Sequence, residues 1–276
     1  MAGQTLPGSK HAALQQTAVI LPARNEQEAI GRVLQDLPPT SVTIVVDNGS
    51  TDATGRVAEE MGATVVREPV PGYGQACLSG LAYLDRAWPL RQPESPTIVA
   101  FLDADYSDDP RCLTDLVSPI ADGQFDFVLG SRLMGDAEPG SMPLQSRLGN
   151  RLAVALIAWF WGVRYTDLGP FRAIRRTSLQ SLEMSDRNYG WTVEMQIKAA
   201  VAGLRMHEIS LPYRRRIGQS KISGTVRGTL LAGAKILCTI ARYHWLMRGW
   251  QPGAVDKIQS ADGPGKINAR RERPTG

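Results

Sequence analysis

Two aspartates one residue apart, Asp103 and Asp105, follow the apolar run 99–102. Such a run is typical of a buried strand, and in a regular strand residues i and i+2 point to the same side. Two carboxylates that face one spot supply the hard oxygen ligands that Mg²⁺ or Mn²⁺ prefers, and such ions commonly bridge to substrate phosphates. We therefore predict a metal site here, with a pair of solvated loop carboxylates as the alternative.

The segments around this pair alternate between short apolar strands and helices. Strands are predicted at 17–22, 42–46, 63–67, 97–102 and 125–130, with a strand-like segment at 206–212. Helices are predicted at 26–37, 53–61, 75–86, 112–120, 144–162, 191–202 and 226–250. This alternation indicates an α/β fold in which helices cover both faces of a mostly parallel central sheet. Ligands bind such sheets at the carboxyl ends of the strands, where we expect segments 22–26, 47–52 and 103–105 to converge.

Composition excludes several other classes of protein. The 276 residues are 43% hydrophobic and 21% charged, which is normal for a folded domain. The net charge of +4 is mild, and no aromatic and basic residues interleave as in nucleic-acid-binding proteins. Three separated cysteines without metal spacing, and an N-terminus without an apolar signal region, predict a cytoplasmic protein. No apolar stretch is long enough to span a membrane, so we expect 152–163 to lie in a buried helix.

Four regions are expected along the chain: a flexible lead-in (1–16), the main domain (17–225), an amphipathic helix (226–250) and a disordered tail (251–276). The helix 226–250 has an apolar stripe and a broadly basic side. Its apolar stripe comprises Leu230, Leu231, Ala234, Leu237, Cys238, Ala241 and Trp245. Such a helix lies either in the surface of a membrane or on the domain's own core. Peripheral contact with the inner face of a membrane is therefore one of two predictions for it.

Seven motifs together resemble those of family 2 glycosyltransferases, in the branch of polyprenyl-phosphate (dolichol-phosphate) mannosyl- and glucosyltransferases. They are LPARNE (21–26), VDNGSTD (46–52), DAD (103–105), GSR (130–132), GPFR (169–172), WTVE (191–194) and RIGQSK (216–221). The resemblance implies a GT-A fold, a nucleotide-sugar donor, Mg²⁺ or Mn²⁺ as cofactor, and inversion at the anomeric carbon. The chain departs from that branch at Ser107, where a glutamine is common, and at GPF (169–171), where SGF is common.

The resemblance also implies roles for single residues. Asp103 and Asp105 would hold the metal, and Asp105 would act in catalysis. The donor would contact Pro22, Arg24, Glu26, Asp47, Asp103, Ala104 and Arg132, and phosphate groups of donor or acceptor would contact Arg216, Ser220 and Lys221. Glu194 stands where many inverting relatives place a carboxylate near the acceptor, either as a general base or to orient Trp191 and its neighbours. The segment GYG (72–74) is either a donor-side loop or a plain turn, and Asp52, Asp108 and Asp109 are expected to cap helices.

The sequence thus predicts an inverting, metal-dependent glycosyltransferase that moves a hexose from a UDP- or GDP-linked donor. A polyprenyl phosphate is the favoured acceptor. The alternatives are a small soluble hydroxyl acceptor and a non-catalytic nucleotide-sugar-binding scaffold. A sugar-phosphate nucleotidylyltransferase is disfavoured because it would carry a Gly-rich loop after the first strand, where this chain has PARNE (22–26).

Overall fold

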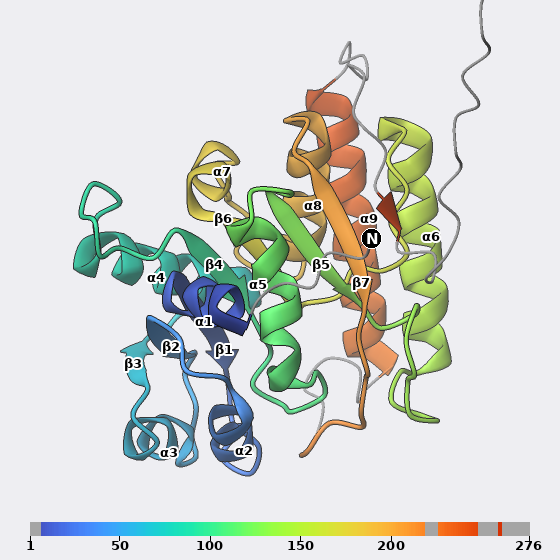
Figure 1. Ribbon diagram of the computed structural model, residues 1–276. Helices are drawn as coiled ribbons and strands as arrows, with labels where there is room; N and C mark the ends of the chain where they lie inside the picture. Colours follow the sequence, from blue (N-terminus) through green and yellow to red (C-terminus); the bar gives the residue numbers. More distant parts are fainter. Residues whose placement is uncertain (1–6, 219–225, 248–258, 261–276) are drawn as a thin grey trace, which may run out of the picture.

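The apolar strands expected from the sequence pair into a single sheet with helices on both sides (Figure 1). The computed structural model describes residues 7–218, 226–247 and 259–260, and within them the sheet has eight strands in the order β3-β2-β1-β4-β6-β5-β7-β8. The strands are β1 Thr17–Ala23, β2 Val42–Asp47, β3 Thr64–Arg67, β4 Ile98–Phe101, β5 Phe127–Ser131, β6 Arg172–Arg175, β7 Met206–Ser210 and β8 Gln259–Ser260. The helices are α1 Pro7–Gln15, α2 Ile30–Asp36, α3 Thr54–Glu60, α4 Tyr73–Ala87, α5 Leu113–Ala121, α6 Leu144–Trp161, α7 Arg176–Ser181, α8 Trp191–Val201 and α9 Val226–Leu246.

The sheet is parallel except at β6, which runs antiparallel to both β4 and β5. The expected α/β class with a mostly parallel sheet is therefore confirmed. Strand β6 was not predicted, because four residues with an arginine at each end do not form an apolar run. Since β6 reverses direction between them, β4 and β5 run the same way and end at the same edge of the sheet.

Alternate side chains of each strand supply two separate cores, as the two-residue period of a strand requires. Ile20, Val99 and Phe101 point into the core that α4, α6, α8 and α9 cover. Val19 and Ala100 point into the other core, which α1, α2 and α5 cover. Figure 1 shows these helices on the two sides of the sheet. The carboxyl edge of the sheet is left for loops.

The chain termini differ from the prediction. The lead-in was expected to be flexible, but α1 is a helix whose Ala13 and Leu14 are buried, and α1 packs against α5. The two apolar residues supply enough burial to dock the helix. Within the predicted disordered tail, β8 pairs with β7, and the other residues of 251–276 lie outside the described residues.

The two long helices α6 and α9 lie side by side (Figure 1). The prediction that 152–163 lies in a buried helix is wrong for one face of α6, because the Leu152 and Trp159 side chains are exposed. In α9 the described part of the expected apolar stripe is exposed, while Ile240 and Tyr243 on another side are buried. Among the helices that the structure describes, none combines the length and apolarity needed to cross a bilayer.

Candidate functional site

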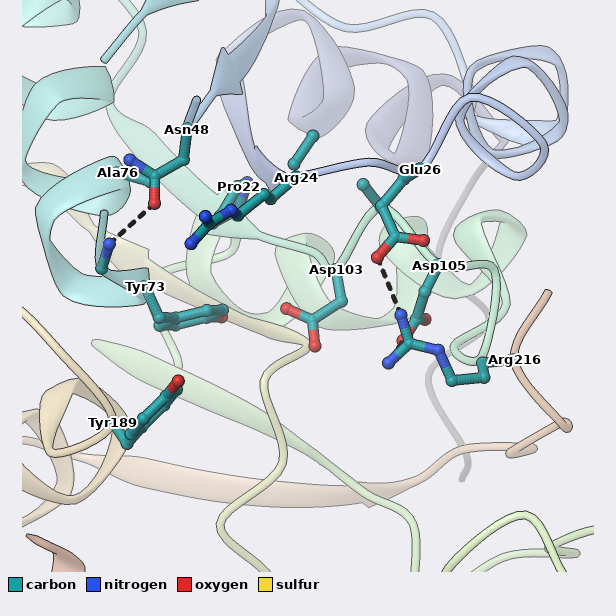
Figure 2. A pocket seen from close by; sticks show the side chains of 13 residues that line it. Pro22, Arg24, Glu26, Asn48, Tyr73, Ala76, Asp103, Asp105, Tyr189 and Arg216 are labelled. Carbon is teal, nitrogen blue, oxygen red and sulfur yellow. Dashed lines mark hydrogen bonds and ion pairs between the residues drawn. The ribbon is translucent and has the colours of Figure 1, made fainter. Parts of the chain in front are cut away.

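A pocket opens at the carboxyl edge of the sheet, where β1, β2 and β4 end (Figure 2). It holds about 730 Å³ including its open mouth. Its lining residues come from six separate segments of the chain and are Pro22, Ala23, Arg24, Glu26, Asn48, Gly72, Tyr73, Ala76, Asp103, Ala104, Asp105, Tyr189 and Arg216. Seven of the predicted site residues are therefore brought together: Pro22, Arg24, Glu26, Asp103, Ala104, Asp105 and Arg216. The sheet topology explains this, because parallel neighbours deliver their following loops to one edge.

Local backbone turns, and not strand alternation, aim the acidic side chains. Strand β4 ends at Phe101, so Asp103 and Asp105 lie in the loop beyond it, and the expectation that they share a face of a regular strand is wrong. Asn25 and Tyr106 adopt left-handed backbone conformations with φ of 53° and 64°. Asparagine tolerates this region, whereas tyrosine rarely occupies it. Each of these turns adjoins a pocket carboxylate, Glu26 in one loop and Asp105 in the other.

The two aspartates differ in how their oxygens are satisfied. Asp105 Oδ1 accepts hydrogen bonds from Ser107 N at 2.9 Å and from Ser107 Oγ at 2.6 Å. Asp103 Oδ1 is shielded from solvent and has no hydrogen-bond partner. Burial, and then the negative charge of Asp105, raise the pKa of Asp103 to about 7. A buried carboxylate beside a second negative charge forms a site that favours a cation.

Arg216 closes one side of the acidic pair. Its guanidinium lies 2.7 Å from Glu26 Oε1 and 3.2 Å from Asp105 Oδ2 (Figure 2). The next backbone amide, Ile217 N, donates to the carbonyl oxygen of Asp105 at 2.9 Å, so the loop after β7 is fastened to the loop after β4. The site therefore has a fixed positive charge beside its carboxylates. Ser220 and Lys221, predicted from the same motif, lie outside the described residues.

Two tyrosines, Tyr73 and Tyr189, form the side of the pocket opposite Arg216 (Figure 2). They are positioned by a close backbone contact between the start of α4 and the loop before α8. A Cβ at Gly74 would lie 2.0 Å from Asp186 O, so only glycine fits there. Gln75 N also donates to Arg187 O at 2.9 Å. Gly72 and Tyr73 of GYG thus line the pocket, while Gly74 makes the close backbone contact. Tyr189 was not predicted, because the segment that positions it is far away in the chain.

Two predicted donor-binding residues do not line the pocket. The Asp47 carboxylate turns back on its own loop and accepts a hydrogen bond from Ser50 N at 2.9 Å. The Arg132 guanidinium forms a bidentate pair with Asp167, at 2.7 and 2.8 Å. Each side chain is thus already bound to a partner, Ser50 or Asp167, that the pattern of strands in the sequence does not indicate. Asn48, which the sequence did not single out, lines the pocket instead of Asp47.

Asn48 holds the loop that follows β3. Its Nδ2 donates to Val70 O at 2.6 Å and to Glu68 O at 3.1 Å, and its Oδ1 accepts from Gly72 N at 2.8 Å. The side chain therefore sets the position of Gly72 and Tyr73 at the pocket. The signal in the sequence is its position directly after Asp47, at the end of a parallel strand.

Glu194 lies away from the pocket and is fully enclosed. Its carboxylate accepts hydrogen bonds from Ser185 N and Oγ, from Asp186 N at 2.6 Å and from Tyr243 Oη at 2.6 Å. Lys198 Nζ lies 2.8 Å from the same group. Although burial acts to raise it, these donors hold the pKa of Glu194 below its ordinary value. The geometry fits the orienting role and not that of a general base in the pocket.

The acidic residues expected as caps differ from one another. Asp109 Oδ1 accepts from Arg111 N at the short 3-10 helix Pro110–Cys112, so its prediction is confirmed. Asp52 Oδ1 accepts from Thr54 N at the start of α3, but the N-cap position itself is Ala53. Asp108 caps nothing. It is buried beside Tyr213, its Oδ2 has no hydrogen-bond partner, and burial raises its pKa well above the ordinary value.

The carboxylates of the pocket suit a divalent cation that takes only some of its ligands from the protein. Within the described ranges no three His, Cys, Asp or Glu side chains gather as a complete metal site. Asp103 and Asp105 nevertheless bring carboxylate oxygens to one pocket, and one of these oxygens is buried without a partner. Mg²⁺ in particular is commonly held by one or two carboxylates while substrate phosphates and water complete its shell.

Comparison with known proteins supports the fold and identifies the family. A model of the family described as glycosyl transferase family 2 matches residues 18–182. The chain is 36% identical over 219 residues to an uncharacterized glycosyltransferase of Mycobacterium tuberculosis, covering 78% of this chain and 93% of the relative. It is 31% identical over 218 residues to a dolichyl-phosphate hexose transferase of Haloferax volcanii, covering 78% and 90%.

Among solved structures, one similar chain is glucosyl-3-phosphoglycerate synthase from Mycobacterium tuberculosis in complex with Mn²⁺, UDP-glucose and phosphoglyceric acid. The TM-score is 0.68 with 24% sequence identity, over 89% of this chain and 86% of that one. At this identity the similarity shows the fold, and the expected GT-A architecture is confirmed.

Proposed function

We propose that this chain, which belongs to glycosyltransferase family 2, transfers a hexose from a UDP- or GDP-linked donor to a polyprenyl phosphate with inversion at the anomeric carbon. The pocket around Asp103 and Asp105 is the observation that carries the proposal, since it joins paired carboxylates to a fixed guanidinium. The dolichyl-phosphate hexose transferase among the relatives supports the class of acceptor.

Asp103 and Asp105 hold Mg²⁺ or Mn²⁺ in this proposal. When bound, the ion neutralises the negative charge that develops on the departing nucleotide diphosphate. The unpartnered Oδ1 of Asp103 is the oxygen best placed for it, because a buried carboxylate oxygen without a donor is costly until a cation meets it. Ser107 keeps Asp105 oriented through its two hydrogen bonds.

The remaining pocket residues recognise the donor. Pro22, Arg24 and Asn48 lie with Tyr73 and Tyr189 around the part of the pocket away from Arg216, where flat apolar surfaces suit a nucleoside (Figure 2). Arg216 suits the diphosphate, because a guanidinium binds phosphate oxygens through parallel hydrogen bonds. Its present carboxylate partners hold it beside the site that the diphosphate occupies. Ser220 and Lys221 follow it in the chain and are proposed as further phosphate contacts.

The enclosure of Glu194 favours an acceptor that needs no strong general base. An alcohol must lose a proton as it attacks, whereas a lipid phosphate is already ionised at neutral pH. With Glu194 committed to five donors from Ser185, Asp186, Lys198 and Tyr243, its carboxylate has no path to an acceptor in the pocket. The acceptor phosphate oxygen attacks the anomeric carbon directly, opposite the leaving diphosphate.

Access to a lipid acceptor implies contact with a membrane, and α9 is proposed to provide part of it. In its described part, Ala234, Leu237, Cys238, Ala241 and Trp245 are exposed along one side. Arg242 is exposed at the edge of this stripe. Apolar and basic side chains arranged in this way suit the boundary between headgroups and acyl chains.

A transfer assay tests the proposal. UDP-glucose and GDP-mannose are each supplied with Mn²⁺ and either undecaprenyl phosphate or a soluble sugar-alcohol acceptor, and products are read by mass spectrometry. Formation of a lipid-phosphate hexose supports the proposal. Transfer only to the soluble hydroxyl acceptor supports the first alternative and contradicts the lipid acceptor. Donor binding without turnover on any acceptor supports a non-catalytic scaffold.

A further inference from the structure

Helix α6 carries an apolar face that the domain leaves uncovered. Four large apolar side chains on it are strongly exposed: Leu144 (69%), Leu148 (58%), Leu152 (50%) and Trp159 (77%). Single exposed apolar residues are ordinary on protein surfaces, but a row of them on one helix needs an explanation.

The four residues form one stripe. At 3.6 residues per turn, their spacings of four, four and seven residues place all four within about 80° of one another around the helix axis. The buried residues of α6, Asn150, Ala153, Ile157 and Trp161, lie on the opposite side. The helix is thus apolar on two opposite faces, and the domain's core covers only one of them. A helix that is hydrophobic all round is normally enclosed.

The charges around the stripe indicate what covers it. The sequence of α6 contains no Asp or Glu, and Arg147 and Arg151 lie along one edge of the stripe. The neighbouring α9 also contains no acidic residue. At the C-terminal ends of the two helices, Phe160 stacks on His244 at 4.0 Å, which brings the ends that carry Trp159 and Trp245 together. Tryptophan beside basic residues is typical of surfaces that meet the headgroup region of a bilayer.

We propose that this outward stripe of α6 (Leu144, Leu148, Leu152 and Trp159, with Arg147 and Arg151) docks on an anionic lipid bilayer. This inference rests on the proposed function for its purpose, the delivery of a lipid-linked phosphate to the pocket. It extends the proposed membrane contact of α9 to a second helix, adjacent to it in the fold (Figure 1).

Helix α6 is also tied to the edge of the sheet where the pocket lies. Asn150 Oδ1 accepts a hydrogen bond from Leu168 N at 2.9 Å, and its Nδ2 donates to Thr166 O. The hydroxyl of Thr166 lies 2.6 Å from that of Ser131, at the carboxyl end of β5. A bilayer docked on the outer face of α6 therefore contacts a helix whose inner face is hydrogen-bonded to this edge of the sheet.

A second copy of the chain is the other occupant to weigh. Pairing two α6 stripes would bring Arg147 and Arg151 of both copies to one interface with no acidic residue of the helix to balance them. Buried unbalanced charge of this kind is costly. An anionic lipid headgroup supplies the missing negative charge, so the bilayer is the better match.

Flotation with lipid vesicles tests the proposal. The full chain and its Leu148→Glu and Met61→Glu variants are each mixed with vesicles of phosphatidylglycerol or of phosphatidylcholine. Met61, at the end of α3, is an exposed apolar residue distant from α6 and serves as the matched control. We expect the wild type and Met61→Glu to float with phosphatidylglycerol and far less with phosphatidylcholine. The Leu148→Glu change is expected to lower the partition coefficient by about tenfold or more, from lost burial and added negative charge.

Three further measurements separate the outcomes. Calorimetric binding of the nucleotide and the thermal midpoint are expected to be unchanged in Leu148→Glu, so failure of the pocket is distinguishable from failure of the docking face. Light scattering reports the oligomeric state. The proposal is overturned if the wild type floats with neither vesicle, if Leu148→Glu floats as the wild type does, or if that change instead dissolves a dimer.

Discussion

The Asp103–Asp105 pair and Glu194 were both predicted from the sequence as carboxylates of the active site, but the structure places them in opposite environments. Asp103 and Asp105 lie in an open pocket, and Asp103 Oδ1 has no hydrogen-bond partner. Glu194 is enclosed, and its carboxylate accepts hydrogen bonds from Ser185, Asp186 and Tyr243. The pKa of Asp103 is raised, by burial and by Asp105, while that of Glu194 is lowered by its hydrogen bonds.

This difference in hydrogen bonding indicates which carboxylate binds a ligand and which stabilises the fold. A carboxylate that is already satisfied stabilises the fold and has nothing left to offer a ligand. A carboxylate left unsatisfied beside a like charge costs free energy in the absence of ligand, and this cost is recovered when a cation binds. We therefore expect changes at the first centre to alter activity and changes at the second to alter stability.

Removing the charge of Asp105 gives the largest expected effect. In Asp105→Asn the oxygen that accepts from Ser107 is kept, but a negative charge of the cation site is lost. Metal-assisted stabilisation of a leaving group is worth several kcal/mol, so we expect kcat/KM to fall about a thousandfold with little change in the free energy of unfolding. The exposed Asp115→Ala on α5 is the control for steady-state kinetics and denaturation. Near-normal turnover in Asp105→Asn would remove the distinction between the two centres.

The Glu194→Ala change is expected to act on stability. It removes the acceptor of the Ser185, Asp186 and Tyr243 donors and leaves Lys198 Nζ with the carbonyl oxygen of Glu183 alone. Breaking a buried pair in this way costs about 4 kcal/mol of unfolding free energy, measured by urea denaturation. The control is Glu60→Ala, whose exposed pair with Arg56 is worth less than about 1 kcal/mol. If Glu194→Ala kept its stability and lost turnover, a general-base role would be favoured instead.

Glu208 combines features of the two centres: it accepts hydrogen bonds as Glu194 does, but its pKa is raised as that of Asp103 is. Its contribution to the free energy of unfolding therefore depends on pH. Thr166 N and Asp167 N donate to it, but burial raises its pKa to about 7 from 4.5. Below pH 4.5 the carboxyl is protonated in both states and contributes nothing. As pH rises to 7 the unfolded chain loses the proton first, so stability falls, and above pH 7 the cost is complete at on the order of 3 kcal/mol.

The Glu208→Gln variant isolates this contribution. Other groups with raised pKa, Asp103 and Asp108, act in the same direction in both proteins, so the difference between variant and wild type is the quantity to follow. Thermal melts between pH 4.5 and 8 are expected to show the variant gaining stability relative to the wild type as pH rises. A difference independent of pH would mean that Glu208 is ionised as easily in the folded as in the unfolded chain.

The smallest expected effect comes from a single hydroxyl. In Tyr243→Phe, Glu194 loses one donor at 2.6 Å and keeps those of Ser185, Asp186 and Lys198. A buried hydrogen bond of this kind contributes about 1 kcal/mol to stability. Tyr189→Phe is the matched control, because its ring lies at the pocket and is partly exposed, and its unfolding free energy is expected to stay unchanged. Equal losses in both variants would contradict the special role of the Glu194 centre.

The sequence predicted well those features that depend on local patterns. Continuous apolar runs indicated the parallel strands β1 to β5, and the polar residues that follow β1 and β4 meet in the pocket as expected. Asp109 caps its helix as expected, because the interaction involves a residue only two positions away. Fold class and the location of the site follow from such short-range rules and from the family motifs.

The features that sequence reasoning missed depend on contacts between distant segments. Glu194 is enclosed by Tyr243, 49 residues further on, and no helix pattern indicates that α9 lies there. Arg132 is held by Asp167, and Tyr189 reaches the pocket through the contact between Gly74 and Asp186. The apolar residues of α6 have a clear period, but only the packed structure reveals which of its two apolar faces is covered.

Calorimetric titration of UDP and GDP, each with and without Mn²⁺, separates a ligand-binding carboxylate from a structural one when wild type, Asp105→Asn and Glu194→Gln are compared. We predict that one nucleotide binds the wild type in a Mn²⁺-dependent manner, that Asp105→Asn loses this binding, and that folded Glu194→Gln retains it. Failure of both nucleotides to bind the wild type, or binding to Asp105→Asn as tight as to the wild type, would contradict a cation site at Asp103 and Asp105.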